Sequence, residues 1–383
     1  MAYSTPIAIS TQFRFCGNPF RADMYQGCDF GCKYCFANTR MAGAFAKTDE
    51  ADMRYIERLF TRAFDKAEDT KSMTIELMQH RVPMHVGGMS DPFQTREWDM
   101  GLTKQLIELS NRYNYPMIFS TKNASFPTDY WNVLDPRLHA FQVSLMGYDD
   151  DFIRYSETNT PTAPERIAFM KELKRRGFWV GIRFQPLIEV DQALKVIDAI
   201  GKGVLDYATV EHLKIFVDDL YVRELYQDKL SAYHKPRQGR QFELNRPAKR
   251  RNIEAVKAAI DCPVGVGDND LHELSDSKCC CGVDCIKGGA FANWLQYNYT
   301  AFAKGGSKDV WTPKCDATES FIGSEIVAAR AGQLVETYDG FEIKPDPSLK
   351  AIVDYYCDHL PFVTDNAYEQ FGLFDAPPAE GKE

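Results

Sequence analysis

Apolar residues along this chain recur in two alternating patterns. Helical spacing predicts helices over 51–69, 99–113, 127–134, 162–176 and 191–202. Short apolar runs, typical of buried strands, occur at 83–88, 116–121, 139–145, 178–184 and 207–215. Strands that alternate with helices indicate βαβ units around a parallel sheet. With one more strand leading into a cysteine-rich loop near residue 30, the pattern predicts an α/β fold with a partial (β/α)6 barrel of the TIM type.

The same pattern divides the chain into four parts. The barrel core is predicted over 13–225, followed by a basic linker and helix segment over 226–260. A C-terminal extension with further cysteines covers 261–373, and a polar tail covers 374–383. The composition of that tail predicts disorder, because it offers too few apolar residues to bury.

Composition and charge narrow the class of protein. The chain has 383 residues and a net charge of −9, so bulk charge does not favour nucleic-acid binding, which then requires a local basic patch. The sequence contains no run of 18 apolar residues, so no membrane span is predicted. The N-terminus lacks the pattern of a signal peptide. Eleven cysteines in such a chain indicate a reducing compartment, and we predict a cytoplasmic location in which clustered cysteines bind metal.

Three of these cysteines lie in one short stretch. Cys28, Cys32 and Cys35 have the spacing C-x3-C-x2-C, and Phe36 follows the third. Thiolates are the usual ligands of iron–sulfur clusters, and three of them leave one iron of a 4Fe–4S cluster without a protein ligand. An open coordination position makes a metal site reactive. Structural zinc fits this spacing poorly, because it usually needs a second, remote pair of ligands. A purely structural cysteine group or a zinc knuckle is the alternative.

The motif resembles that of the radical S-adenosylmethionine (SAM) superfamily. The resemblance implies a partial barrel of the radical SAM type whose open iron binds the amino and carboxylate groups of SAM. It also implies that one electron from the cluster cleaves SAM to methionine and a 5′-deoxyadenosyl radical, which abstracts a hydrogen atom from a substrate. A reducing partner such as flavodoxin or ferredoxin is then expected as the electron donor.

Polar and glycine residues follow the predicted strands, at the ends where the active sites of such barrels lie. Glycines there let the backbone approach a ligand closely, and a lysine at a barrel mouth can meet a carboxylate. The Gly87-Gly88 pair resembles the superfamily's Gly-Gly-Glu motif, which receives the SAM amino group, and the segment around Arg183 resembles its element beside the adenine. Taken singly, each residue has an equally good structural explanation. Together they predict a cofactor-binding set: Gly87, Gly88, Ser90, Asp91, Lys122, Ser144 and Arg183.

Further residues resemble one branch of the superfamily, the spore photoproduct lyase and DNA-repair-photolyase-like group, over about residues 13–215. They are Asn18-Pro19-Phe20, Ser90-Asp91-Pro92-Phe93, Thr121-Lys122 and Pro161-x-x-x-Glu165-Arg166. By position, Ser90, Lys122 and Ser144 fall where the lyases contact SAM.

The chain departs from this branch at one position. The lyases carry a cysteine just before the Ser-Asp pair, which returns a hydrogen atom to the repaired thymine, whereas this chain has Met89. A thioether has no S–H to donate. This departure argues against spore photoproduct repair itself.

A local concentration of positive charge occurs over residues 234–251, which contain seven Lys and Arg residues and one acidic residue, Glu243. Such a segment could follow a phosphate backbone, with Tyr233 and Phe242 available to stack on bases. A solvated loop and helix start explains the charge equally well.

A second group of cysteines follows in the C-terminal extension. Three adjacent cysteines cannot all face one centre, so the candidate ligands of a second iron–sulfur cluster or zinc ion are Cys279, Cys281, Cys285 and Cys315. The alternative is that some of them are buried as small apolar residues.

Three hypotheses for the function result. The first is a radical SAM enzyme that acts on a nucleic acid base or nucleotide, in repair or modification. The second is a radical SAM enzyme with an auxiliary cluster that acts on a peptide or small metabolite. The third is a metal-binding interaction module without catalysis. Neither the oligomeric state nor a catalytic residue beyond the cofactor set can be predicted from the sequence.

Overall fold

The computed structural model describes residues 2–3, 6–9, 18, 20–37, 49–66, 72–79, 81–229, 232–234, 241–277, 279–286 and 288–291. Cys315, the tail over 374–383 and most of the predicted extension over 261–373 lie outside these residues.

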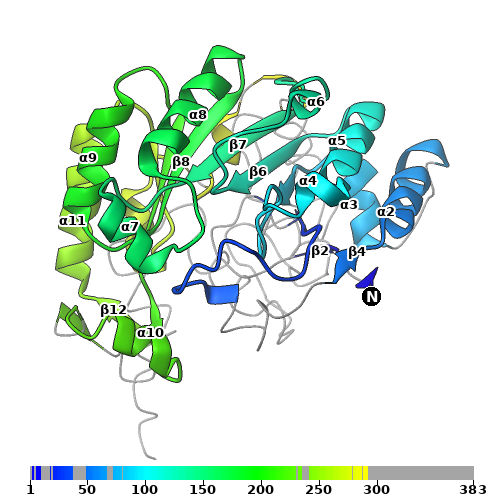
Figure 1. The fold of residues 1–383 in the computed structure, drawn as a ribbon. Helices are drawn as coiled ribbons and strands as arrows, with labels where there is room; N and C mark the ends of the chain where they lie inside the picture. The colour runs from blue at the N-terminus through cyan, green and yellow to red at the C-terminus, as the bar shows by residue number, and fades with distance from the viewer. Residues whose placement is uncertain are drawn as a thin grey trace, which may run out of the picture.

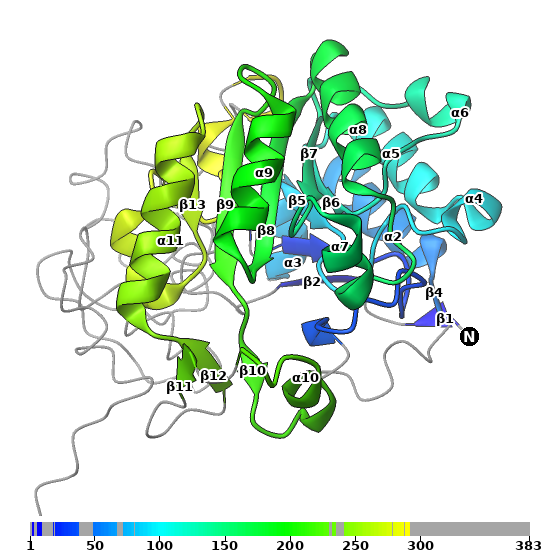
Figure 2. The same cartoon turned by 60° about the vertical axis from the view of Figure 1, so that its left-hand side comes forward.

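A mostly parallel eight-stranded sheet forms the centre of the structure (Figures 1 and 2). Its strand order is β13-β9-β8-β7-β6-β5-β3-β2. Six consecutive parallel strands make the predicted barrel: β3 (Phe20–Ala22), β5 (Met84–Val86), β6 (Met117–Thr121), β7 (His139–Ser144), β8 (Trp179–Leu187) and β9 (Tyr207–His212). The strand β2 (Ile7–Ile9) pairs antiparallel with β3 at one edge. A separate parallel pair joins β1 (Ala2–Tyr3) to β4 (Glu50–Ala51).

Helices cover the outer face of this sheet, as Figures 1 and 2 show. The layer includes α2 (Met53–Phe60), α3 (Met73–Gln79), α4 (Glu97–Met100), α5 (Leu102–Tyr113), α6 (Thr128–Trp131), α7 (Asp150–Ser156), α8 (Ala163–Arg175) and α9 (Val190–Ile200). Because helices cover one face and packed side chains fill the other, β6 and β9 are buried at every position.

The predicted helices are present, but three differ clearly in their extent. The helix predicted over 127–134 is observed only as the four residues of α6. The helix predicted over 51–69 leaves α-geometry at Phe60 and continues as one wider turn, Thr61–Asp65. The helix predicted over 99–113 is two helices, α4 and α5, separated by Gly101 at φ 63°. A left-handed residue cannot continue an α-helix, so the chain turns there. The end of α8 agrees with the prediction, since Gly177 follows it at φ 88°.

The main sheet continues past residue 225, where the sequence predicts that the barrel ends. Beyond β9 the chain forms a small antiparallel sheet of β10 (Ile215–Phe216), β11 (Tyr233–His234) and β12 (Gln241–Leu244), which lies with α10 (Leu220–Leu225) below β9 in Figure 2. The helix α11 (Arg246–Ala259) then packs on α9 through Ile253 and Val256, and β13 (Val264–Val266) pairs with β9. Two 3-10 turns, Asn269–Leu274 and Val283–Cys285, follow.

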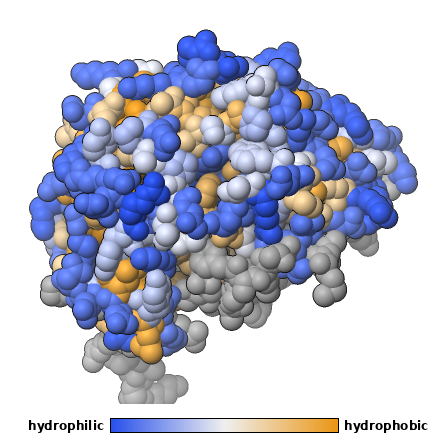
Figure 3. Space-filling model, in the orientation of Figure 1, coloured by the Kyte–Doolittle hydropathy of each residue, from blue (hydrophilic) through white to orange (hydrophobic). Residues whose placement is uncertain are grey.

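The face of the molecule seen in Figure 3 is mostly hydrophilic. Its lower left, over α10, includes an apolar area, where the Leu220 side chain is 70% exposed. None of the helices in the described residues combines the length and the apolar character that a membrane span needs.

Candidate functional site

One cavity of about 370 Å³ lies among the C-terminal ends of the barrel strands. It brings together residues that are up to 223 positions apart in the sequence, from Asn18 to Gln241. The three cysteines of the C-x3-C-x2-C motif and all seven predicted cofactor-binding residues line it: Cys28, Cys32, Cys35, Gly87, Gly88, Ser90, Asp91, Lys122, Ser144 and Arg183.

The cysteine loop is held by the turn between α7 and α8. The Lys33 amide donates to the Ser156 carbonyl at 2.9 Å, and the Asn159 side-chain amide donates to the Asp29 carbonyl at 3.0 Å. On the other side, the Asp29 amide donates to Gln94 Oε1 at 3.1 Å. The thiols at Cys28, Cys32 and Cys35 are therefore carried by a loop whose backbone is anchored at both ends.

Burial shapes the chemistry of these thiols. It raises the pKa of Cys28 to about 12, with Asp91 adding to the rise, and it holds the pKa of Cys32 well above the usual value. A thiol with a raised pKa becomes a thiolate when a metal replaces its proton. In the described residues, the His, Cys, Asp and Glu side chains do not group in threes around one ion.

The Gly87–Asp91 segment is positioned by a buried carboxylate and by a close backbone contact. Asp23 on the loop after β3 accepts from the amides of Met89 at 2.7 Å and Ser90 at 3.3 Å. Gly87 has φ 96°, and a Cβ at that position would lie 2.6 Å from the Ser120 carbonyl. Glycine is therefore required at position 87 by packing against β6. The sequence had suggested another reason, the close approach of a ligand to the backbone.

Gly87→Ala is expected to lower the free energy of unfolding by about 1–3 kcal/mol, because the new methyl group clashes with β6 and the left-handed backbone disfavours it. Gly88→Ala is the matched control, since its Cβ would meet its nearest neighbour, Arg21, at an ordinary 3.5 Å. Urea unfolding of both variants measures the difference. Equal stabilities would show that the backbone relaxes around residue 87 without cost.

Asp91 connects this segment to the end of β6. Its carboxylate accepts from Thr121 Oγ1 at 2.8 Å, from the Lys122 amide at 2.6 Å and from the Phe93 amide at 2.9 Å. Burial raises the pKa of Asp91 to about 6 against the opposing effect of these donors. Because both carboxylate oxygens already accept from the protein, Asp91 orients Lys122 and the loop.

Ser90 carries a buried hydroxyl that lines the cavity. Its side chain is 7% exposed, and its Oγ has no hydrogen-bond partner among the residues that the structure describes. Leaving a buried hydroxyl unsatisfied costs about 1–3 kcal/mol. A polar ligand group in the cavity would remove that cost.

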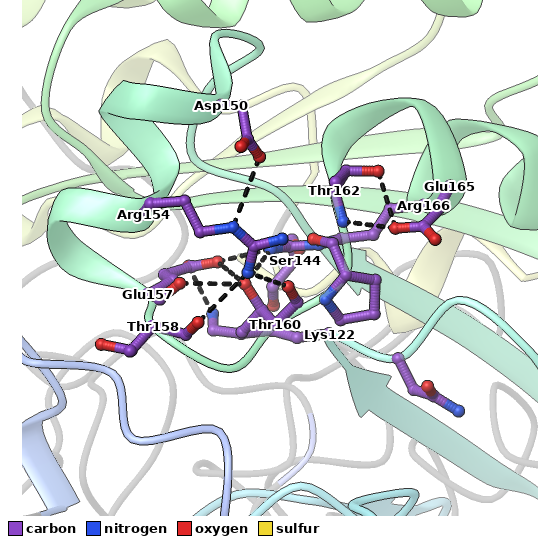
Figure 4. A network of polar contacts seen from close by, with 12 residues as sticks. Lys122, Ser144, Asp150, Arg154, Glu157, Thr158, Thr160, Thr162, Glu165 and Arg166 are labelled. Carbon is purple, nitrogen blue, oxygen red and sulfur yellow. Dashed lines mark hydrogen bonds and ion pairs between the residues drawn. The ribbon is translucent and has the colours of Figure 1, made fainter.

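Lys122 belongs to a buried polar network at the end of β6 (Figure 4). Its Nζ lies 3.3 Å from Glu157 Oε1, and Arg166 from α8 lies 2.7 Å from Glu157 Oε2. Tyr34 of the cysteine loop also donates to Glu157. Glu157 and Arg166 are fully buried, so solvent does not screen them. Two cations, Lys122 and Arg166, share this carboxylate, and Lys122 lines the cavity.

The charges in this network set one another's protonation. Burial alone would raise the pKa of Glu157, but Arg166 and Lys122 hold it at about 2. Burial would likewise lower the pKa of Lys122, but Glu157 raises it above the usual value. Glu157 is a site residue that the sequence analysis missed. It belongs to no motif, and only the packing of the α7–α8 turn against the cysteine loop brings it to the cavity wall.

Ser144 and Arg183 lie on the neighbouring strands β7 and β8. The Ser144 carbonyl accepts from Arg166 Nη1 at 2.8 Å. The Arg183 side chain points along the inside of the sheet, where it donates to Gln142 Oε1 at 2.7 Å and to Ser120 Oγ at 3.3 Å. Arg183 is therefore held by neutral groups away from the network around Lys122.

The second cysteine group packs against the inner face of the sheet. Cys279, Cys280 and Cys281 are at most 7% exposed. Their carbonyls accept, in order, from Tyr207 Oη at 3.0 Å, Thr209 Oγ1 at 2.9 Å and Gln142 Nε2 at 2.6 Å. This burial agrees with the alternative of structural cysteines. Metal binding by Cys279, Cys281, Cys285 and Cys315 stays a prediction, because Cys315 lies outside the described residues.

The described part of the basic segment is largely neutralised. Lys249 is buried between Glu243 at 3.2 Å and Asp270 at 2.6 Å. Arg246 and Arg250 both pair with Glu273, at 2.8 and 2.7 Å. These cations stabilise the packing of α11, so they do not form the open positive stripe that the sequence suggested. Residues 235–240 lie outside the described part of the chain.

Comparison with known proteins identifies the fold. No protein-family model and no curated protein matches the chain by sequence. Among solved structures, a spore photoproduct lyase mutant with bound AdoMet and dinucleoside spore photoproduct is similar, with a TM-score of 0.50 and 16% identity over 70% of this chain and 80% of that one. Spore photoproduct lyase complexed with dinucleoside spore photoproduct also has a TM-score of 0.50, with 14% identity over 67% and 77% of the two chains.

A weaker similarity is to SuiB of Streptococcus suis bound to S-adenosylmethionine, with a TM-score of 0.43 and 12% identity over 66% of this chain and 52% of that one. The similarity to the lyase extends over most of both chains. The predicted fold class is therefore confirmed: this chain has a mostly parallel α/β sheet that forms a partial barrel, and it shares this fold with spore photoproduct lyase.

Proposed function

We propose that the chain is a radical SAM enzyme. Cys28, Cys32 and Cys35 would hold a 4Fe–4S cluster, and the Gly87–Asp91 segment, Lys122 and Ser144 would face SAM. The observation that carries this proposal is the cavity in which the cysteine motif and the predicted cofactor residues meet. A reducing protein such as flavodoxin or ferredoxin is proposed as the electron donor.

The residues present fit these two groups. The three thiols lie on an anchored loop at the cavity wall. The Ser90 hydroxyl has no hydrogen-bond partner among the described residues, and a polar ligand atom in the cavity could form a hydrogen bond with it. The Lys122 ammonium, which shares its partner Glu157 with Arg166 and lines the cavity, suits the carboxylate of an amino acid such as the methionine part of SAM. When bound, a 4Fe–4S cluster supplies the electron that cleaves SAM.

The chain's own contribution is binding and orientation. Glu157 fixes Lys122 and, through Tyr34, the cysteine loop, so that the cluster ligands and the cofactor-facing cation are set by one carboxylate. Asp91 fixes the backbone at Lys122. Such preorganised groups act without reorganising during a reaction, which is how a protein accelerates chemistry at a bound cofactor.

Lys122→Ala is expected to weaken SAM binding about 10- to 100-fold, since a hydrogen bond to a charged group is worth about 1.5–3 kcal/mol. The fold should survive, because Glu157 keeps Arg166 as its partner. Lys104→Ala is the control: Lys104 pairs with Asp129 at the surface and does not line the cavity. Calorimetric titration with SAM measures the effect. Unchanged affinity in Lys122→Ala would show that this lysine does not face the ligand.

Anaerobic reconstitution tests the function itself. About four irons and four sulfides per chain, with a visible charge-transfer band, are expected for one cluster, and about eight of each for two. Addition of SAM and a chemical reductant is then expected to yield 5′-deoxyadenosine. A protein that binds one zinc ion and yields none would be a metal-binding module, and the enzyme proposal would be wrong.

We further propose a nucleic acid base or nucleotide as the substrate. The shared fold with a lyase whose structure holds a dinucleoside spore photoproduct supports this choice. Met89, which has no S–H to donate, argues for modification over reversal of a spore photoproduct. Binding to DNA and RNA at several salt concentrations tests the proposal, because each phosphate contact adds about one to the log–log salt slope. Without such binding, a peptide or small metabolite becomes the preferred substrate.

A further inference from the structure

A row of polar side chains crosses the inner face of the barrel, one strand after another. We name it the interior row: His85 on β5, Ser120 on β6, Gln142 on β7, Arg183 and Gln185 on β8, and Glu211 on β9. Every member except Gln142 lines the cavity. The proposed functions of the cysteines and Lys122 use none of these contacts.

Neighbouring members of the row are hydrogen-bonded. His85 Nε2 lies 2.7 Å from Ser120 Oγ, and Ser120 Oγ lies 3.3 Å from Gln142 Oε1. Arg183 donates to Gln142 Oε1 at 2.7 Å and also to Gln185, which in turn donates to Glu211. These contacts fix the Arg183 guanidinium from both sides, so its position is set before any ligand binds.

The charge of Arg183 is not matched by a carboxylate. Within the described part of the chain, its contacts are with neutral oxygens of Ser120, Gln142 and Gln185, and it forms no ion pair. The nearest acid along the row, Glu211, is already paired with Lys214 at 2.6 Å. A guanidinium has five N–H donors, and the three contacts above leave others free for a ligand in the cavity.

A second arginine lines the same part of the cavity. Among the residues that the structure describes, Arg21 on β3 pairs with Asp23 at 3.7 Å, and Asp23 also accepts from two backbone amides. Burial, together with the charges of Arg183 and Arg21, lowers the pKa of His85 to about 4. His85 is therefore neutral at pH 7 and offers an uncharged ring nitrogen between the two cations.

From this geometry we infer that the interior row, around Arg183 and Arg21, is a binding site for an anionic group of the substrate, a phosphate or a carboxylate. Guanidinium groups bind both anions through paired N–H donors. The inference rests on the proposed function, in which the carboxylate of SAM is met by Lys122. It assigns Arg183, which the sequence placed with the cofactor, to the substrate.

The test uses the reconstituted full-length protein with its cluster oxidised, and inorganic phosphate and acetate as probes. Line broadening of the ³¹P signal and saturation transfer to the acetate methyl group measure the two affinities. Wild type is expected to bind at least one probe saturably. Arg183→Gln keeps the hydrogen-bonding shape but loses the charge, and is expected to weaken that binding about 10- to 100-fold. Arg21→Gln is expected to weaken it less.

Controls separate this inference from the proposed function. Arg175→Gln removes an exposed arginine that pairs with Glu172 on α8, and it should bind the probes as wild type does. SAM affinity is measured in parallel and should be unchanged in Arg183→Gln. SAM could neither bind nor be cleaved while Arg183→Gln still weakens the binding of the anionic probes. In that case the proposed function would be wrong and the anion-binding site would be supported. Arg183→Lys keeps a charge and should retain part of the binding, which guards against misfolding of the glutamine variant.

Three results would overturn the inference. One is the absence of saturable binding of either probe to wild type. Another is a loss of SAM affinity in Arg183→Gln without a loss of probe binding, which would return Arg183 to the cofactor. The third is probe binding by Cys281→Ser but not by wild type. The Cys279 and Cys280 thiols and the charge of Arg183 lower the pKa of the buried Cys281 thiol, so this result would show that the Cys281 thiolate already neutralises Arg183 in the wild-type protein. A preference for phosphate over acetate would favour a nucleotide substrate, and the reverse a substrate with a carboxylate.

Discussion

Alanine at Cys28, Cys32 or Cys35 is expected to abolish the cleavage of SAM. Each substitution removes one of three protein ligands, and the remaining two cannot hold a 4Fe–4S cluster with a single open iron. The loop itself should keep its place, because it is anchored by backbone and side-chain contacts at Lys33 and Asp29 that do not involve the thiols. Iron content, visible absorption and 5′-deoxyadenosine formation measure the effect.

Cys262→Ala is the matched control for these three variants. Cys262 is a half-buried free cysteine that packs at the edge of the hydrophobic core and does not line the cavity. It should retain the iron content and the activity of wild type. A single alanine variant at Cys28, Cys32 or Cys35 with normal absorption and normal cleavage would disprove the radical SAM proposal.

Glu157→Gln is expected to lower the free energy of unfolding by about 3–5 kcal/mol, because it leaves Lys122 and Arg166 buried without a counter-charge. Urea unfolding at neutral pH measures this loss. Glu172→Gln on α8 is the control: Glu172 is paired with Arg175 and Arg176 at the surface, and such pairs contribute about 0–1 kcal/mol. Equal losses in the two variants would contradict the central role of Glu157.

The contribution of Glu157 should also depend on pH. Its pKa in the folded protein is about 2, below the usual glutamate value of 4.5, so folding favours the ionised form. The stabilisation is therefore complete above about pH 4.5 and is lost as the pH falls toward 2. The difference in stability between wild type and Glu157→Gln should shrink over this range. A difference that stays constant would show that the carboxylate does not act through its charge.

Much of the fold follows from local patterns in the sequence. The apolar runs of β5 to β9 predict a parallel sheet because both faces of such strands are buried, and the capping pair Thr162 and Glu165 predicts where α8 begins. Short segments were harder to recognise. The helix α3 and strand β13 are too short for a periodic pattern, and their packing against neighbours decides their structure.

The chemistry of the site divides in the same way. The C-x3-C-x2-C spacing predicts a cluster loop, because three thiolates within eight residues can bind one compact group, with a structural cysteine group or a zinc knuckle as the alternative. The roles of the basic residues at 246–250 could not be predicted, since Lys249 is neutralised by Asp270, an acid 21 positions away that the helix α11 brings close. Charge counted along a chain does not show which charges are paired in space.

The sequence of this protein was sufficient to predict the alternating strands and helices of the barrel, the cysteine motif and the strand ends at which polar residues gather. The tertiary structure was needed to show that Glu157 joins Lys122 to the cysteine loop, that Gly87 is required by contact with β6, and that Arg183 lines the cavity with its guanidinium bonded to neutral oxygens. The physical reason is range. Backbone preference and hydrophobic periodicity act between residues a few positions apart, whereas buried charge and close packing depend on neighbours that the fold brings together.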